Sequence, residues 1–170
     1  MYQTDPALPS ASRRSSPLLD LAWRTAFRIG FPLARIWWRL RCPRHEGALV
    51  TVYVGPALLL VRASYRPEWG LPGGGLRPGE LPEAAARREL AEEIGLTTHS
   101  LLPAGIACGL WDGRRDRVHF FELRLDQLPN LCLDNREIIA ARLISPDELP
   151  TMKLTGPVAT FLARTPAPKA

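Results

Sequence analysis

The stretch LPGGGLRPGELPEAAARRELAEEIGL, residues 71–96, places three consecutive glycines before a short segment rich in glutamate. Pro82 suits the first position of a helix, and Gly95 suits the left-handed residue that ends one. The pattern therefore predicts a helix over residues 82–94. Leu81 occupies the N-cap position, where Ser, Thr or Asp is usual, so we expect this helix to be capped from elsewhere in the chain.

Glu89, Glu92 and Glu93 share one face of this predicted helix. At about 100° per residue, that face lies away from the buried side defined by Leu90 and Ile94. Their repulsion costs only about 0.2–0.5 kcal/mol per pair on a solvated surface. A solvated acidic face is the common explanation for such a pattern. The alternative is a site for Mg²⁺ or Mn²⁺, which take hard oxygen ligands that carboxylates one turn apart can supply.

The glycine triplet Gly73, Gly74 and Gly75 bears on this choice. Glycines permit positive φ and let the backbone approach a ligand closely, as in phosphate-binding loops. Alone, such a triplet is more often a flexible turn. Arg62 and Arg66 flank it and are candidates for phosphate contacts, with surface solvation the equally weighted alternative.

The glycines and glutamates together form one extended pattern. Nine positions over 23 residues match the Nudix box: Gly74, Glu80, Arg88, Glu89, Leu90, Glu92, Glu93, Gly95 and Leu96. The sequence therefore resembles the Nudix hydrolase family at every defined position of the box. The resemblance implies a Nudix fold over residues 46–165, an α/β/α sandwich around a mixed β-sheet.

The resemblance also implies the reaction. Nudix enzymes use Mg²⁺ or Mn²⁺ to hydrolyse a diphosphate that links a nucleoside or related group to another moiety, by attack of water at phosphorus. An anionic substrate needs charge neutralisation and an activated nucleophile, and bound divalent ions supply both. The alternative is a non-catalytic Nudix module that senses a nucleotide. Such modules commonly lose box glutamates, whereas this chain retains them all.

Motif position assigns the expected roles. Glu89, Glu92 and Glu93 resemble the metal-binding glutamates of the family. Glu80 resembles the supporting carboxylate, and Arg88 resembles the arginine that orients the cluster. An Arg88–Glu92 pair at i,i+4 is geometrically allowed.

The general base that takes the proton from water has two candidates. One is Glu89 in the box. The other is Glu137, in a downstream acidic segment, DNREIIAARLISPDELP, that resembles one found in the family. A surface charge at a strand edge is an equally weighted explanation for Glu137.

The substrate stays open at this level. ADP-ribose enzymes of the family often carry a proline about 15 residues after the box, and here Trp111-Asp112 stands in its place. Trp69 and Trp111 are candidates for stacking on a base, although a tryptophan at a strand end is more often part of the core. We expect His119 to be structural, and His45 and His99 to lie on the surface.

Composition agrees with one domain plus an extension. The chain has 170 residues, 46% of them apolar and 23% charged. The net charge of +5 is uneven, because residues 1–45 hold eight arginines against two aspartates (+6) and the remainder holds 14 basic and 15 acidic residues (−1). Cys42, Cys108 and Cys132 are too widely spaced for a disulfide framework or zinc site, which favours a reducing cytoplasm.

The N-terminal region is predicted to differ from the domain. We expect residues 1–17 to form a disordered tail, residues 18–45 a basic amphipathic helical extension with a bend at Pro32, and residues 166–170 a second tail. Three roles for the extension stay open. It covers an apolar face of the domain or of a homodimer partner, it lies on a membrane through residues 18–41 with arginines toward anionic headgroups, or it contacts nucleic acid, the least favoured role.

The remaining elements follow from alternation and turn residues. Strands are predicted over residues 48–55, 57–64, 101–111, 117–125 and 138–145, with tight turns at Gly55-Pro56 and Asp112-Gly113. A short helical turn capped by Ser145 and a closing helix over residues 156–164 complete the domain. No apolar run reaches the roughly 18 residues that a membrane span needs.

Overall fold

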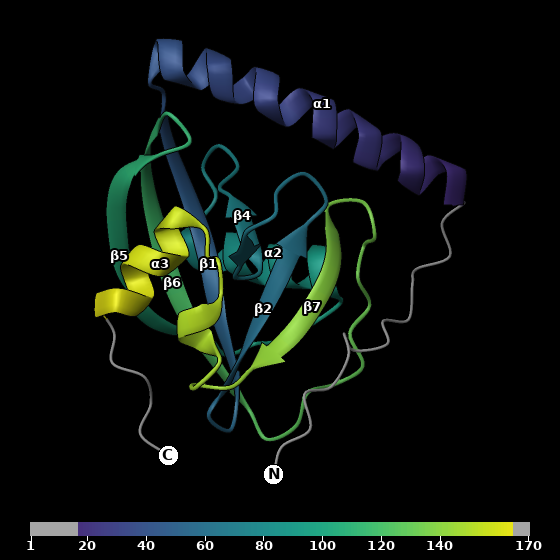
Figure 1. Ribbon diagram of the computed structural model, residues 1–170. Helices are drawn as coiled ribbons and strands as arrows, with labels where there is room; N and C mark the ends of the chain where they lie inside the picture. The colour runs from purple at the N-terminus through teal and green to yellow at the C-terminus, as the bar shows by residue number, and fades with distance from the viewer. Residues whose placement is uncertain (1–16, 165–170) are drawn as a thin grey trace.

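The computed structural model describes residues 17–164, so the expected tails at 1–17 and 166–170 lie almost wholly outside the described residues. Figure 1 shows a twisted sheet with a helix on each face and a long helix across one end. The elements in chain order are α1 Pro17–Arg41, β1 Arg44–Val54, β2 Ala57–Ala63, β3 Trp69–Gly70, β4 Gly73–Gly75, α2 Pro82–Ile94, β5 Leu102–Trp111, β6 Arg114–Leu125, β7 Ile138–Ile144, a 3₁₀ turn Leu149–Thr151 and α3 Gly156–Arg164.

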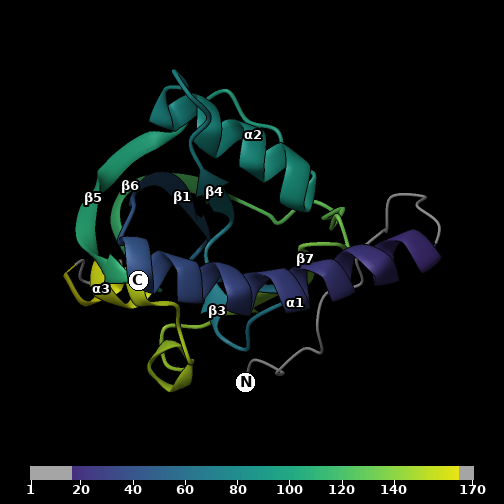
Figure 2. The same cartoon turned by 90° about the horizontal axis from the view of Figure 1, so that it is seen from above.

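The sheet is mixed, as predicted. Its strand order is β3-β2-β1-β6-β5, with β4 paired to β1 and β7 paired to β2. The long β1 and β6 run parallel, and every other strand pair is antiparallel. The connection from β1 to β6 carries α2 across one face of the sheet, and α3 covers the opposite face (Figures 1 and 2).

Two hydrophobic clusters hold these layers together. Alternate residues of each strand point to opposite faces, so Val50 and Val52 of β1 pack toward α2 with Leu90 and Ile94. On the other face Phe120 of β6 stacks on Phe161 of α3, with ring centroids 3.9 Å apart. The α/β/α sandwich predicted from the resemblance is therefore confirmed.

The boundaries of α2 agree with the sequence. The helix runs from Pro82 to Ile94, and Gly95 ends it in the left-handed conformation with φ 71°. Leu81 provides no side-chain cap, and the N–H of Ala85 donates to its carbonyl. That bond is the first turn of the helix itself, and no side-chain cap of this N-terminus is found among the described residues.

Three local expectations need correction. The glycine triplet is a short strand, β4, because it pairs with residues 47–49 of β1. β1 begins at Arg44, inside the expected extension, because its parallel pairing with β6 starts there. α1 continues through Pro32 without a break in helix. Pro32 cannot donate to the carbonyl of Arg28, and both residues are exposed.

α1 lies across the end of the sandwich where the β5–β6 turn, the end of β2 and the loop before β7 meet (Figures 1 and 2). Among residues 17–164, no helix combines the length and the hydropathy that crossing a bilayer requires.

We predict that Gly73→Ala destabilises the domain far more than Gly79→Ala. Gly73 has φ 137°, and a Cβ there would overlap the carbonyl oxygen of Ala48 and the Cα of Leu49. Gly79 has φ 76° but no atom within 4 Å of an added Cβ. We expect losses of about 3 kcal/mol or more against about 1–2 kcal/mol in denaturant unfolding. Equal losses would show that backbone strain alone, not the close approach of β4 and β1, explains Gly73.

Candidate active site

Arg88 is the centre of the acidic cluster on α2. Its guanidinium donates to both oxygens of Glu80 at 2.8 Å, to Glu89 at 2.6 Å and to Glu92 at 3.3 Å. It also donates to the carbonyl of Gly75 in β4 at 3.1 Å. The hydrogen bonds to Arg88, and then the N–H of Arg77, lower the pKa of Glu80 to about 2. The Arg88–Glu92 pair allowed by the spacing exists, but Glu80 and Glu89 make the shorter contacts.

Glu93 departs from the solvated face that its helical position suggested. Its side chain is 7% exposed, and its Oε2 accepts a hydrogen bond from the N–H of Gly73 at 2.8 Å. Burial raises the pKa of Glu93 well above its usual value, and the nearby charges of Glu137 and Glu89 raise it further. Burial also raises the pKa of Glu89, against the lowering effect of Arg88. Strand β4 covers this part of α2, which the helix pattern alone could not indicate.

The glycines of β4 leave room for these side chains. A Cβ on Gly74 would lie 2.6 Å from Oε1 of Glu89, and a Cβ on Gly75 would lie 2.9 Å from Nε2 of His45. Larger residues would therefore displace the carboxylate or the imidazole. The triplet brings the backbone against α2, a function distinct from the flexible turn considered for it.

Glu137 is held from two sides just before β7. The Tyr65 hydroxyl donates to its Oε1 at 2.7 Å. The carboxylate of Asp134 accepts the backbone N–H groups of Glu137 and Ile138, at 3.1 and 2.9 Å. Burial, followed by the charge of Glu137, raises the pKa of Tyr65. Sequence reasoning missed Tyr65 and Asp134, although Asp134 in the DNRE segment is a recognisable side-chain cap.

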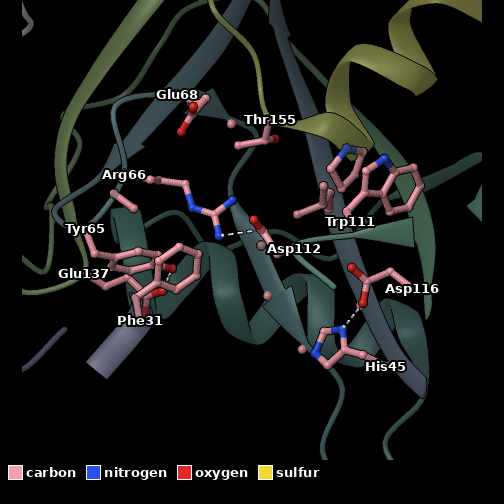
Figure 3. Close-up of a pocket in the computed structure, with 18 of the residues that line it drawn as sticks. Phe31, His45, Tyr65, Arg66, Glu68, Trp111, Asp112, Asp116, Glu137 and Thr155 are labelled. Atoms are coloured by element: carbon pink, nitrogen blue, oxygen red, sulfur yellow. Dashed lines mark hydrogen bonds and ion pairs between the residues drawn. The ribbon is translucent and has the colours of Figure 1, made fainter. Parts of the chain in front are cut away.

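Glu93 and Glu137 both line a cavity of about 490 Å³, together with residues of α1, β1 and β2. Figure 3 shows Glu137 beside Tyr65 and Phe31 on one side, with Trp111 and the His45–Asp116 pair on the other. The glycines of β4 also line it. The cavity therefore reaches the acidic cluster through Glu93, while Glu80, Glu89 and Glu92 do not line it.

Of the two arginines predicted to contact phosphate, Arg66 lines the cavity and Arg62 does not, although both border a second groove. Arg66 lines the cavity, donates to Asp112 at 3.2 Å and lies 4.5 Å from the ring centroid of Phe31. Arg62 lies 5.3 Å from the ring centroid of Trp69 and lines a shallow groove on the other side of β2.

Of the predictions made for the histidines, the one for His45 needs correction and the one for His119 agrees with the structure. His45 is not simply a surface residue, because its ring lines the cavity and its Nδ1 lies 3.1 Å from the buried carboxylate of Asp116. The register of β1 against β6 brings these two side chains together. His119 lies 2.7 Å from Glu46, in agreement with a structural role. Trp111 lines the cavity, and Trp69 packs beside the α3-side core.

The inner side of α1 roofs this cavity. Phe27 and Phe31 place their ring centroids 5.7 and 4.7 Å from that of Tyr65. Three arginines of the predicted basic extension contact the domain. Their contacts are Arg24 to the carbonyl of Asn135 at 2.6 Å, Arg28 to the carbonyl of Ser64 at 3.1 Å, and Arg35 to Asp112 at 3.1 Å. The contribution of this helix to the cavity wall was not predicted.

The donor set fits a hard divalent cation chemically. Within residues 17–164, no three acidic, His or Cys side chains converge closely enough to hold an ion as they stand. Glu89 is instead paired with Arg88, and Glu93 with the backbone of Gly73. The charge of Glu137 raises the pKa of both Glu89 and Glu93, and the charge of Glu89 raises that of Glu93, a repulsion that a cation would relieve.

Comparisons with known proteins agree with this geometry. A model of the NUDIX domain matches residues 43–164. An RNA pyrophosphohydrolase of Pseudomonas savastanoi is 34% identical over 111 residues, 65% of this chain and 67% of that protein. Mouse diphosphoinositol polyphosphate phosphohydrolase 3-alpha is 40% identical over 63 residues, 36% of each chain. A MutT Nudix hydrolase structure from Burkholderia pseudomallei gives a TM-score of 0.65 at 20% identity, covering 72% of this chain and 98% of that one.

Since the family match covers most of the chain, the chain belongs to the Nudix family. Within that family it is a pyrophosphohydrolase, an enzyme that hydrolyses phosphoric anhydrides. The structural likeness, at 20% identity, supports the fold alone.

We predict that Glu93→Gln stabilises the metal-free protein at pH 8. Because the folded-state pKa of Glu93 is raised above 4.5, the native state loses stability as this group ionises with rising pH. Glutamine keeps the acceptor for Gly73 without the charge. We expect the unfolding midpoint to rise by roughly 2–4 °C, the effect of about 1 kcal/mol on a chain of this size.

The gain should shrink as the pH falls toward 4.5, where the wild-type carboxylate becomes protonated. Glu83→Gln, on the exposed part of the same helix, is the control and should not reproduce it. A lower midpoint for Glu93→Gln at pH 8 would contradict the assignment of a strained buried carboxylate.

Proposed function

We propose that this enzyme hydrolyses a diphosphate that links a nucleoside to another moiety, by attack of water at phosphorus with Mg²⁺ or Mn²⁺. The observation that carries the proposal is the cavity of about 490 Å³ with Glu93 and Glu137 in its wall. Its size is that of a small-molecule site. The helix roof favours a small nucleotide derivative over the end of a long RNA.

Glu89, Glu92 and Glu93 would hold the cation, with Glu80 supporting them through Arg88. The cation, when bound, supplies neutralisation of phosphate charge and lowers the pKa of water. For Glu89 to join it, the carboxylate must exchange its contact with Arg88, which the two oxygens of Glu80 can continue to hold.

Glu137 is our preferred general base, and Glu89 is the alternative. Glu137 faces the cavity and is oriented by a neutral hydroxyl, that of Tyr65, so its second oxygen can accept a proton. Glu89 already accepts a hydrogen bond from the guanidinium of Arg88 at 2.6 Å, so it would have to give up that contact before this oxygen could take a proton from water.

The substrate contacts divide between polar and aromatic side chains. Arg66 lines the cavity and would meet a phosphate there, and Gly74 and Gly75 line the same space. Arg62, on the other side of β2, would reach only a part of the substrate that extends out of the cavity. Trp111 and Phe31 offer ring faces for a base, which supports a nucleoside as one of the two moieties.

Two further features support proposals about where the enzyme works and what it contacts. Cys42, Cys108 and Cys132 are all free thiols, which supports a reducing cytoplasm. The side of α1 that points away from the domain is apolar and exposed. We propose this side as a docking surface, for a second copy of the chain in a homodimer or for a membrane to which the enzyme is peripheral.

A panel of nucleoside diphosphate derivatives with Mg²⁺ or Mn²⁺ tests the activity, with products identified after reaction in ¹⁸O-water. We expect ¹⁸O in one phosphate product. Glu137→Gln should lower kcat roughly 10²–10⁴-fold, the usual loss of a general base. Glu122→Gln, which affects a pair with Arg124 outside the cavity lining, is the control. Absence of turnover on the whole panel, or a fully active Glu137→Gln, would contradict the proposal.

The variant Phe31→Ala tests whether the substrate contacts the side of the cavity that α1 forms. Because Phe31 lines the cavity while Phe27 still packs against Tyr65, we expect KM for the best substrate to rise roughly fivefold, the worth of one aromatic contact of about 1 kcal/mol, with a smaller change in kcat. Ile29→Gln lies on the opposite side of α1 and should leave both constants unchanged. Identical kinetics for Phe31→Ala and wild type would show that substrate does not meet the roof.

A further inference from the structure

The side of α1 that points away from the domain forms a continuous apolar surface, here called the outer face. Its members recur at helical spacing and are each more than half exposed: Leu18, Leu21, Ile29, Leu33, Ile36, Trp37 and Leu40. The hydroxyl of Thr25, a polar residue on this side, bonds to the helix's own carbonyl at Leu21. So large an exposed apolar surface marks an interaction site.

The charges around the outer face are of one sign. Arg39 borders it along one edge and Arg41 is exposed at its end, whereas Arg28, on the same edge, donates to the carbonyl of Ser64 in the domain. Asp20 is the one acidic residue in residues 17–41, and it lies on the inner side, buried and 3.1 Å from Arg136. The border of the outer face is therefore basic, with no carboxylate beside it.

This charge pattern decides between two occupants. In a pair of helices packed through their outer faces, the arginines of each border would meet no acidic side chain of the other helix. An anionic lipid surface supplies negative groups for the basic edge and an apolar layer for the side chains beside it. Trp37, exposed on the helix, has the amphipathic ring that suits the boundary between lipid and water.

We propose that α1 docks this enzyme on anionic lipid surfaces through its outer face. The inner face is already committed to the domain through Arg24, Arg35 and the Phe31–Tyr65 contact. The two faces are used at once, so docking leaves the roof of the cavity in place. This last step rests on the proposed function, whereas the docking itself does not.

Flotation of the full-length chain with vesicles tests the docking without any need for turnover. One set contains equal amounts of phosphatidylglycerol and phosphatidylcholine, and the other contains phosphatidylcholine alone. We expect roughly tenfold or more protein to float with the anionic set, because each arginine near an anionic surface strengthens binding several-fold. Ile29→Gln/Ile36→Gln should abolish flotation and keep the hydrolysis of a water-soluble substrate at the wild-type rate.

The matched control is Leu102→Gln/Leu110→Gln on β5. These leucines are 60% and 65% exposed, against 61% and 57% for Ile29 and Ile36, but they belong to β5 and not to the outer face. The control should float like wild type. Leu33→Gln/Leu40→Gln alters the outer face at two other positions and replaces the first variant if circular dichroism shows that it is unfolded.

Three results would overturn the proposal. The first is wild-type protein that does not float with anionic vesicles. The second is an equal loss of flotation in the β5 control, which would assign binding to apolar exposure in general. The third is a dimer in light scattering that the outer-face variant dissociates while flotation is absent, which would assign the outer face to a second copy of the chain.

Discussion

The close approach of β4 to α2 is the constraint on which the site depends. At Gly73 the backbone donates to the buried Glu93, at Gly74 it leaves no room for a side chain beside Glu89, and at Gly75 its carbonyl accepts from Arg88. Three successive residues thus position three side chains of the helix. The pairing of β4 with β1 fixes this strand in turn, so the geometry of the acidic cluster is set by the sheet.

That geometry concentrates negative charge where water cannot screen it. Arg88 compensates Glu80 and Glu89, whereas the carboxylate of Glu93 is buried against the backbone N–H of Gly73, and burial raises its pKa. Folding therefore retains an electrostatic cost at this site, and a bound cation would remove it. A site that is costly when empty binds its ion more tightly than one whose carboxylates are already satisfied, which is the usual exchange of stability for function.

The sequence predicted the parts of this enzyme that depend on local rules. Pro82 and Gly95 defined α2, alternation located the strands, and the spacing of the box identified the family. It could not predict the burial of Glu93, because strand β4 covers it, or the cavity position of His45, because that follows from the register of β1 against β6. The sequence predicted a basic helix at α1, but it could not predict which surface the arginines of this helix contact. Such facts arise from contacts between distant segments.

Tyr65 explains why α1 belongs to the site and is not only an appendage. One side of its ring packs against Phe31 of the helix, and its hydroxyl holds Glu137. Loss of the helix would expose the Tyr65 ring and weaken its hold on the carboxylate of Glu137. Tyr65 therefore couples α1 to the acidic side chains of the site. The arginines that clamp the helix to the rim protect this coupling, and they leave the apolar side of the same helix free to meet another surface.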